Sequence, residues 1–206
     1  MFSTLLSFAS SIKYIGYIII AILVLLFMVL IHELGHYIAG KILKFKINEF
    51  SIGFGPKIFQ KKNKSGELIS LRAFPLGGYC AFEGETDENK DNPAAFNNQK
   101  PWKRLIVLFS GAFFNFLSAI IFSFILLLSM NYGFWQALGQ AIPFTFKWAW
   151  EILVIFWELI TGQLSIKALG GPVTTVKVIA DLTQQNLLLL LLPLIAVNLA
   201  VFNLLP

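Results

Sequence analysis

Two histidines and a glutamate lie close together near the N-terminal end of the chain. His32, Glu33 and His36 read His-Glu-Leu-Gly-His, and the chain has no other histidine. In an α-helix, residues four apart share one face, so both imidazoles can bind one Zn²⁺ with Glu33 beside it. This arrangement is suited to peptide hydrolysis, in which Glu33 would take a proton from the attacking water and pass it to the leaving amine.

The motif follows an apolar run, Tyr14–Ile31. Charged or ionisable residues in a hydrophobic segment are costly, so the motif is expected to be functional rather than a chance set of surface residues. A signal peptide would have an apolar region of about 7–15 residues and a small-residue cleavage site. The run is longer and ends in His-Glu, which favours a retained transmembrane helix.

The composition is that of an integral membrane protein. Of 206 residues, 57% are hydrophobic and 13% are charged, and the mean hydropathy is +0.73. Soluble domains carry about 25% charged residues. The net charge of +5 does not indicate a nucleic-acid partner, because the basic residues adjoin hydrophobic segments. The single cysteine, Cys80, excludes an intrachain disulfide, and nothing marks it as a nucleophile.

We therefore expect an all-α polytopic membrane protein, forming one membrane-embedded domain over residues 1–206. Four segments are apolar enough to span a bilayer, which needs about 20 helical residues. They are approximately residues 14–39, 104–130, 142–161 and 187–206.

The third segment carries Lys147, Glu151 and Glu158 on one helical stripe, together with several tryptophans. The stripe could face the bundle interior or water, or the helix could lie at the membrane interface. Spanning is favoured because it gives the last helix a consistent direction.

The basic residues predict the orientation in the membrane. Of 16 Lys and Arg residues, 12 lie between Lys41 and Arg104, which places that loop in the cytoplasm and the N-terminus outside. The motif then lies near the cytoplasmic end of its helix. Lys167 and Lys177 fall in a second cytoplasmic loop, and the last helix runs from the cytoplasm outward.

The first loop, residues 41–103, contains β-forming sequence. Ile47–Gly53, Lys57–Gln60 and Glu67–Phe74 are rich in β-branched and aromatic residues and predict a small membrane-associated hairpin or sheet. The glycines Gly77 and Gly78 follow, where they allow close backbone approach or unusual φ. Glu83–Asn98 is expected to be a mobile, solvated connector.

Motifs spread along the chain resemble the bacterial site-2 protease family of intramembrane zinc metalloproteases, near the regulator-of-sigma-E-protease branch. Besides the histidine motif, they are the sequences beginning at Phe50 (FSIGFGP), Pro75 (PLGGY, with Gly84-Glu85), Trp102 (WKR), Ser110 (SG, with Asn115-Phe116), Leu169 (LGGPV), and Asn198 with Asn203 (NLLP).

The resemblance implies specific roles for the matching residues. His32 and His36 would be zinc ligands and Glu33 the general base. Gly77 and Gly78 would belong to a β structure that helps to engage an extended substrate. Asn115 and Asn198 would support the site, and Asn203 would contact substrate near the metal. Hydrogen bonding between helices is the alternative role for Asn115 and Asn203.

Two features depart from the family pattern. Family members follow Asn-x-x-Pro with Leu-Asp-Gly, whose Asp is the third zinc ligand, whereas this sequence stops at Pro206. Asp87, Asp91 and Asp181 are not convincing substitutes, and we interpret the chain as a truncated form. Residues 131–141 are also too few for the PDZ domain that many relatives carry there.

The leading hypothesis is a zinc protease of the bacterial inner membrane with its site near the cytoplasmic side. Its substrate would be a transmembrane protein, such as an anti-sigma factor or a signal-peptide remnant. The alternative is an inactive relative or fragment that binds membrane segments without cleaving them. A transporter that uses the His-Glu pair as a proton relay fits less well, because four helices without an inverted repeat are unusual for one.

Overall fold

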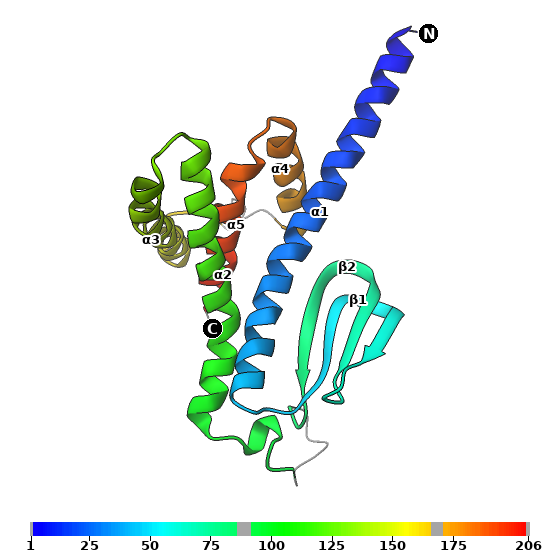
Figure 1. The fold of residues 1–206 in the computed structure, drawn as a ribbon. Coiled ribbons are helices and arrows are strands. Elements are labelled where there is room, and N and C mark those ends of the chain that lie inside the picture. Colours follow the sequence, from blue (N-terminus) through cyan, green and yellow to red (C-terminus); the bar gives the residue numbers. More distant parts are fainter. Residues whose placement is uncertain (1, 86–91, 166–170, 205–206) are drawn as a thin grey trace. The chain divides into compact units, whose positions relative to one another are not determined.

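The computed structural model describes residues 2–85, 92–165 and 171–204 (Figure 1). Its elements, in order, are α1 (Phe2–Ile42), β1 (Ile47–Lys62), β2 (Leu68–Phe82), the short 3₁₀ helix η1 (Phe96–Asn98), α2 (Pro101–Ser129), α3 (Phe134–Ile160), α4 (Pro172–Gln184) and α5 (Leu188–Phe202). They form two compact units. The sheet unit comprises residues 25–117 and 202–206, and the helical unit comprises residues 1–24 and 118–201.

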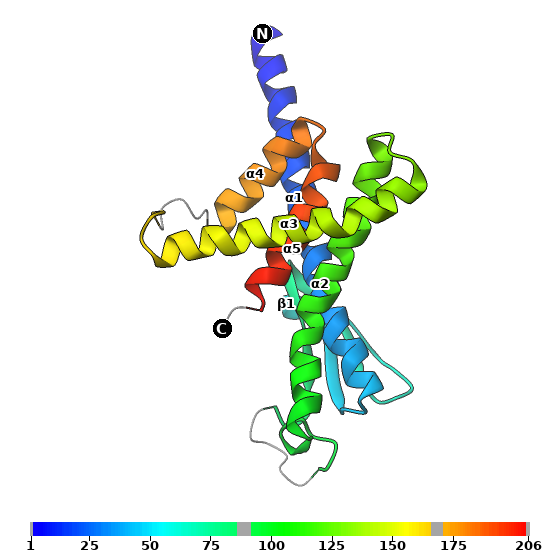
Figure 2. The same cartoon turned by 90° about the vertical axis from the view of Figure 1, so that its left-hand side faces the viewer.

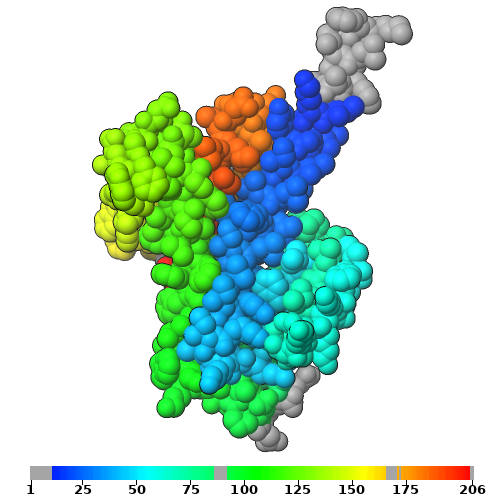
Figure 3. All heavy atoms as spheres, viewed as in Figure 1, coloured from blue at the N-terminus to red at the C-terminus, as the bar shows by residue number. Residues whose placement is uncertain are grey.

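The sheet unit contains one antiparallel pair of long, bent strands. The segment 47–52 of β1 pairs with 78–82 of β2 on one side and with 68–71 on the other, while 57–62 pairs with 68–72. Segment 47–52 is therefore central, and segment 78–82 forms an edge of the sheet. Figure 3 shows these strands as the cyan surface beside the blue of α1.

Two glycines bend β1 between its paired segments. Gly53 and Gly55 have φ of 85° and 83°, a region that side chains with a Cβ avoid. At Gly53 a Cβ would also lie 2.8 Å from the carbonyl oxygen of Phe74. The two strands expected at 47–53 and 57–60 are thus parts of one bent strand.

The core of the sheet unit joins α1, the sheet and α2. Its buried members are Ala39, Phe45, Ile47, Phe82, Phe96 and Val107. Phe96 stacks obliquely on Phe45 and Phe82, with ring centroids 5.4 and 5.5 Å apart.

The burial of Phe96 corrects the expectation of a fully solvated connector at 83–98. The backbone N–H of Phe96 donates to the carbonyl of Glu83 at 2.7 Å, and Asn92 Nδ2 donates to the Glu83 carboxylate at 2.5 Å. The middle of the connector, residues 86–91, lies outside the described residues.

The turn between the strands is fastened to the end of α1. Glu67, which is 5% exposed, accepts hydrogen bonds from Tyr37 and Lys41 of α1. Because Tyr37 lies one residue after His36, this contact fixes the sheet close to the histidine motif.

In the helical unit, α2 and α3 pack through small residues. Ala137 and Ala141 are fully buried against Leu127, and the hydroxyls of Ser123 and Thr145 are 3.0 Å apart. Close approach through small and hydroxyl-bearing residues is typical of membrane helix pairs.

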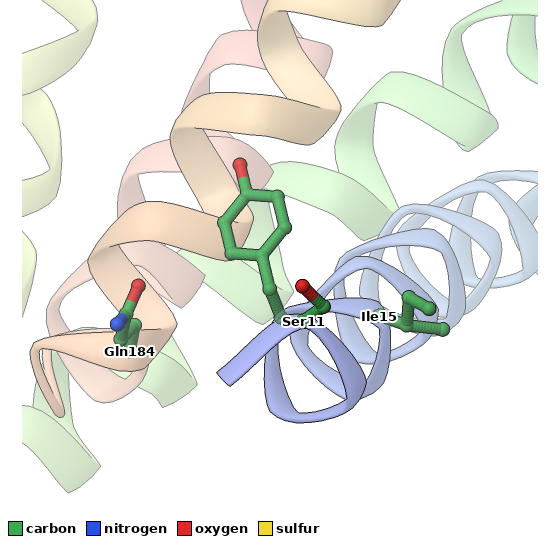
Figure 4. Close-up of a pocket in the computed structure, with 4 residues that line it drawn as sticks. Ser11, Ile15 and Gln184 are labelled. Carbon is green, nitrogen blue, oxygen red and sulfur yellow. The ribbon is translucent and has the colours of Figure 1, made fainter. Parts of the chain in front are cut away.

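The start of α1 meets α4 in the same unit. The Tyr14 hydroxyl donates to Asp181 at 2.9 Å. Figure 4 shows the adjoining open pocket, lined by Ser11, Tyr14, Ile15 and Gln184. Its lining offers no pair of metal-binding side chains.

Among the described residues, two helical stretches are long and apolar enough to cross a membrane, Ser11–Ile42 and Pro101–Ser129. α5 is apolar but has 15 residues. α3 has 27 residues but carries the three charges of its stripe. Two of the four expected spans are therefore found by length and composition.

The directions of the helices differ from the expectation. In Figures 1 and 2, α1 and α5 run the same way within the helical unit, the end of α2 runs the opposite way, and α3 lies across them. The expectation that the last helix runs opposite to α1 is therefore wrong. The sequence-based prediction also did not include α4, because its sequence is too polar to be recognised as a membrane span.

Candidate metal centre

The two histidines of α1 meet at their ring nitrogens. His32 Nε2 and His36 Nε2 are 3.0 Å apart, and the rings meet edge to face. Two imidazole nitrogens on a tetrahedral zinc lie about 3.3 Å apart, given Zn–N distances of about 2.0–2.1 Å. The helix thus holds the two nitrogens at nearly the separation that one zinc ion requires.

The protonation of His36 is fixed from its far side. Its Nδ1 lies 2.7 Å from the carbonyl oxygen of Val107 on α2. A carbonyl can only accept, so Nδ1 carries the proton and Nε2 keeps its lone pair. Metal-binding histidines are commonly oriented by such a hydrogen bond to the non-ligating nitrogen.

The far nitrogen of His32 is flanked by two asparagines. Nδ1 lies 3.3 Å from the amide nitrogen Nδ2 of Asn115 on α2 and 3.2 Å from Nδ2 of Asn203, which follows α5. An amide can turn either its NH₂ or its oxygen toward the ring. With the oxygen facing a protonated Nδ1, His32 Nε2 is free to bind a metal.

Glycines provide the space around the rings. A Cβ on Gly111 of α2 would lie 2.5 Å from His36 Nε2 and 2.7 Å from His32 Nε2. One on Gly35 of α1 would lie 2.5 Å from the carbonyl oxygen of Ser110. Gly35 therefore allows α1 and α2 to cross closely, and Gly111 keeps the volume between the imidazole nitrogens open.

Glu33 faces the edge strand of the sheet. Its carboxylate faces the backbone N–H of Cys80. A Cβ on Gly78 would lie 2.7 Å from Ser51 O and 3.7 Å from Glu33 Cγ, and one on Gly77 would meet the Phe54 ring at 2.5 Å. Both glycines thus allow close approach, and neither has a positive φ.

The thiol of Cys80 is not activated. Burial, then the negative charges of Glu33, Glu85 and Glu67, raise its pKa to about 12. The thiolate, which is the reactive form, is therefore scarce at neutral pH.

The donors present fit a zinc site with two protein ligands. No group of three His, Cys, Asp or Glu side chains comes together within residues 2–85, 92–165 and 171–204. Asp181 is engaged with Tyr14 in the helical unit, and Asp87, Asp91 and Pro206 lie outside the described residues. Asn198 is exposed on α5, and its supporting role stays a prediction.

Sequence reasoning missed several contributors to this site. The Val107 carbonyl and the Cys80 N–H are backbone groups, which side-chain patterns cannot reveal. Gly111 was part of a motif, but its role depends on the crossing of α1 and α2.

Comparison of the sequence with models of known protein families identifies its family. The model of peptidase family M50 matches residues 20–206 of the chain. The chain belongs to this family. The resemblance to site-2 proteases is thereby confirmed at the level of the family, and its members are metalloproteases.

Three bacterial relatives, each named "Putative zinc metalloprotease", are similar to this M50 chain. The Helicobacter pylori J99 protein is 44% identical over 117 residues, covering 54% of this chain and 33% of that protein. The Fusobacterium nucleatum protein is 41% identical, and the match covers 52% of this chain and 31% of that protein. The Clostridium acetobutylicum protein is 44% identical, and the match covers 51% of this chain and 31% of that protein. The chain spans about a third of the length of these relatives.

Proposed function

We propose that this M50 chain is the core of an intramembrane zinc protease that hydrolyses a peptide bond in a transmembrane segment of a partner protein. The observation that carries the proposal is the pairing of His32 and His36 at 3.0 Å on an apolar helix, with Glu33 beside them. The names of the relatives support zinc as the metal.

The residues divide the chemistry between them. Bound by His32 and His36, zinc would polarise the substrate carbonyl and acidify water. Glu33 takes the proton from water as its oxygen bonds to the amide carbon. It then delivers that proton to the amine nitrogen as the carbon–nitrogen bond breaks. Val107, Asn115 and Asn203 hold the imidazoles in the required orientation.

The sheet edge is placed to present the substrate. A transmembrane helix has its backbone amides hydrogen-bonded internally, so it must unwind before hydrolysis. Segment 78–82 of β2 forms an edge beside Glu33. An unwound segment that adds to this edge would lie extended next to the base, because strand addition supplies main-chain hydrogen bonds.

A site within the membrane favours a membrane protein as the substrate. We propose a short bacterial membrane protein, such as an anti-sigma factor or a signal-peptide remnant, as the substrate. The chain would lie in the inner membrane, with 12 of its 16 basic residues between Lys41 and Arg104 on the cytoplasmic side.

The helix directions support three crossings, by α1, α2 and α5. If α1 enters from outside and α2 returns, α5 must start outside to run parallel to α1. α3 then lies along the outer surface with its charged stripe in water, as an interfacial helix does.

Substitution of Glu33 tests the mechanism. We expect Glu33→Gln in the full-length protein to abolish cleavage of a membrane substrate while about one zinc per chain remains, because the amide cannot take a proton. Cleavage is followed in lipid vesicles and zinc by elemental analysis. Glu151→Gln on α3 is the control and should retain activity.

Turnover by Glu33→Gln at the wild-type rate would refute the role of Glu33. A wild-type protein that binds the substrate but holds no zinc would instead favour an inactive binding protein.

A further inference from the structure

The edge segment 78–82 directs some of its backbone N–H groups away from the sheet. In an antiparallel pair, residues alternate between facing the partner strand and facing outward. The N–H of Cys80 faces the Glu33 carboxylate on α1. The N–H of Glu83 donates to the carbonyl of Lys46, beside β1, at 2.9 Å. The N–H of Phe82, one residue before Glu83, therefore faces outward along the same edge as that of Cys80.

This second outward donor is taken by an acidic side chain. Phe82 N–H donates to Glu85 Oε2 at 3.3 Å. Gly84, with φ of 72°, makes the turn that brings Glu85 back onto the strand. Glu85 also lies near enough to Glu33 and His36 to interact with their charges.

The side chains of Glu33 and Glu85 differ in how easily they can move away from the edge of β2. Glu33 lies within α1, where its position is set by the helix and by the strand packed against it. Glu85 is exposed and follows the turn, so it can rotate into water without moving the sheet. Phe82 itself is 7% exposed and anchored in the core, which keeps its N–H in place.

We infer that Glu85 is a displaceable cap on the edge at which substrate docks, occupying the position of a substrate backbone carbonyl. The inference rests on the proposed strand addition. Successive outward donors are about 6.8 Å apart, two residues along a strand. The carbonyl that replaces Glu85 would therefore lie two substrate residues from the one beside Glu33 and fix the register of cleavage.

A cap of this kind also guards the empty edge. Exposed edge strands invite pairing with other chains, and charged side chains are a common protection. Any segment that enters must compete with Glu85 for Phe82 N–H. A segment that touches the edge only briefly does not displace Glu85, whereas an extended backbone provides a carbonyl that replaces it.

Substitution at position 85 tests the cap. If substrate must first break the hydrogen bond between Phe82 and Glu85, and that bond has ordinary strength, its apparent affinity is weakened about fivefold. Glu85→Ala should therefore bind substrate about fivefold more tightly. Glu85→Gln keeps an oxygen acceptor and should stay within about twofold of wild type. Glu83→Gln, whose carboxylate bonds Asn92 instead, is the matched control and should be unchanged.

The probe is a fluorescent Leu- and Val-rich transmembrane peptide with two central glycines, added to the full-length protein in lipid nanodiscs. Binding is read by anisotropy immediately after mixing, and amide hydrogen exchange at Phe82 is measured without peptide. Exchange should be faster in Glu85→Ala than in wild type or Glu85→Gln.

Each contrary result is decisive. Unchanged exchange at Phe82 in Glu85→Ala would show that no cap exists. Equal tightening by the Ala and Gln variants would assign the effect to charge rather than to the hydrogen bond. Binding that is unchanged or weaker in Glu85→Ala, or absent in every variant, would overturn docking at this edge. Loss of peptide cleavage with binding intact would count against the proposed hydrolysis alone.

Discussion

Gly111 leaves open the space in which the proposed zinc ion would bind. It lies on α2 opposite both imidazoles, and a Cβ there would come within 2.7 Å of both Nε2 atoms. Such contacts are shorter than real Cβ atoms tolerate. A methyl group there would fill the space between the Nε2 atoms of His32 and His36, where the proposed zinc would bind.

We expect Gly111→Ala to lower zinc affinity at least about 100-fold, because the methyl group displaces the imidazoles from their shared geometry. Helix propensity alone would favour alanine by about 1 kcal/mol. A loss of zinc affinity would therefore not reflect a weakened α2. Zinc affinity is measured by competition with a chelator. Gly139→Ala on α3, where nothing lies within 4 Å, is the control, and equal affinities for both variants would contradict the assignment.

At this scale the sequence indicated some residues and not others. The spacing of His32 and His36 predicts their shared face, and the structure places them 3.0 Å apart. The neighbours of His32 are Asn115 and Asn203, which are 83 and 171 residues away. No local pattern relates such distant positions, and only the family motifs drew attention to them.

Among the elements, the sheet depends on a polar cluster at its centre. Arg72 donates to Glu49, to Ser51 Oγ and to the carbonyl of Gly55. Burial opposes ionisation of Glu49, but hydrogen bonds from Ser70, Arg72 and Tyr79 outweigh it and lower its pKa. The cluster ties the bent part of β1 to β2.

We expect Glu49→Gln to destabilise the sheet by about 1–3 kcal/mol, because Arg72 loses its charged partner. Since the folded-state pKa of Glu49 is below its unfolded value, this stability is present above about pH 4.3 and is lost as the pH falls through the folded pKa. Hydrogen exchange of the sheet amides measures it in the full chain. Acid should lower the stability of the sheet more in the wild type than in Glu49→Gln. An equal loss of stability in both proteins would refute the stabilising role of the Glu49 carboxylate.

The elements themselves were partly predictable. Strand-forming residues marked 47–53 and 67–74, and only the family resemblance placed Gly77 and Gly78 in a β structure, where they lie within β2. Glycine is intrinsically unfavourable in strands, and here the close approach to α1 and Phe54 outweighs that preference. α4 was missed because only long apolar runs were counted as helices.

For the whole molecule, the direction of α5 determines the number of crossings. In the proposed three-crossing arrangement, its parallel course with α1 requires that the chain has returned to the outer side before α5 begins. The sequence could not show the direction of α5, because α3 is long enough to span the membrane. The charges of α3 are compatible both with spanning and with lying at the membrane surface.

Cysteine labelling in cells tests the topology. In a Cys80→Ser background, we expect Lys64→Cys to react only after the membrane is opened, and Met130→Cys and Gln163→Cys to react from outside with an impermeant maleimide. Both helices adjoining position 163 lie on the outer side in the three-crossing arrangement. Labelling of Gln163→Cys together with Lys64→Cys would show that α3 crosses the membrane.

The hydrogen bond between Asn203 and His32 joins residues 171 positions apart, which has a consequence for biosynthesis. The sheet is local, with all its pairings between residues 47 and 82, so it can form while the second helix is still on the ribosome. The environment of His32 is completed only when α5 has been made and inserted. In the proposed protease, a nascent chain in the membrane would therefore have its docking edge before the surroundings of His32 are complete.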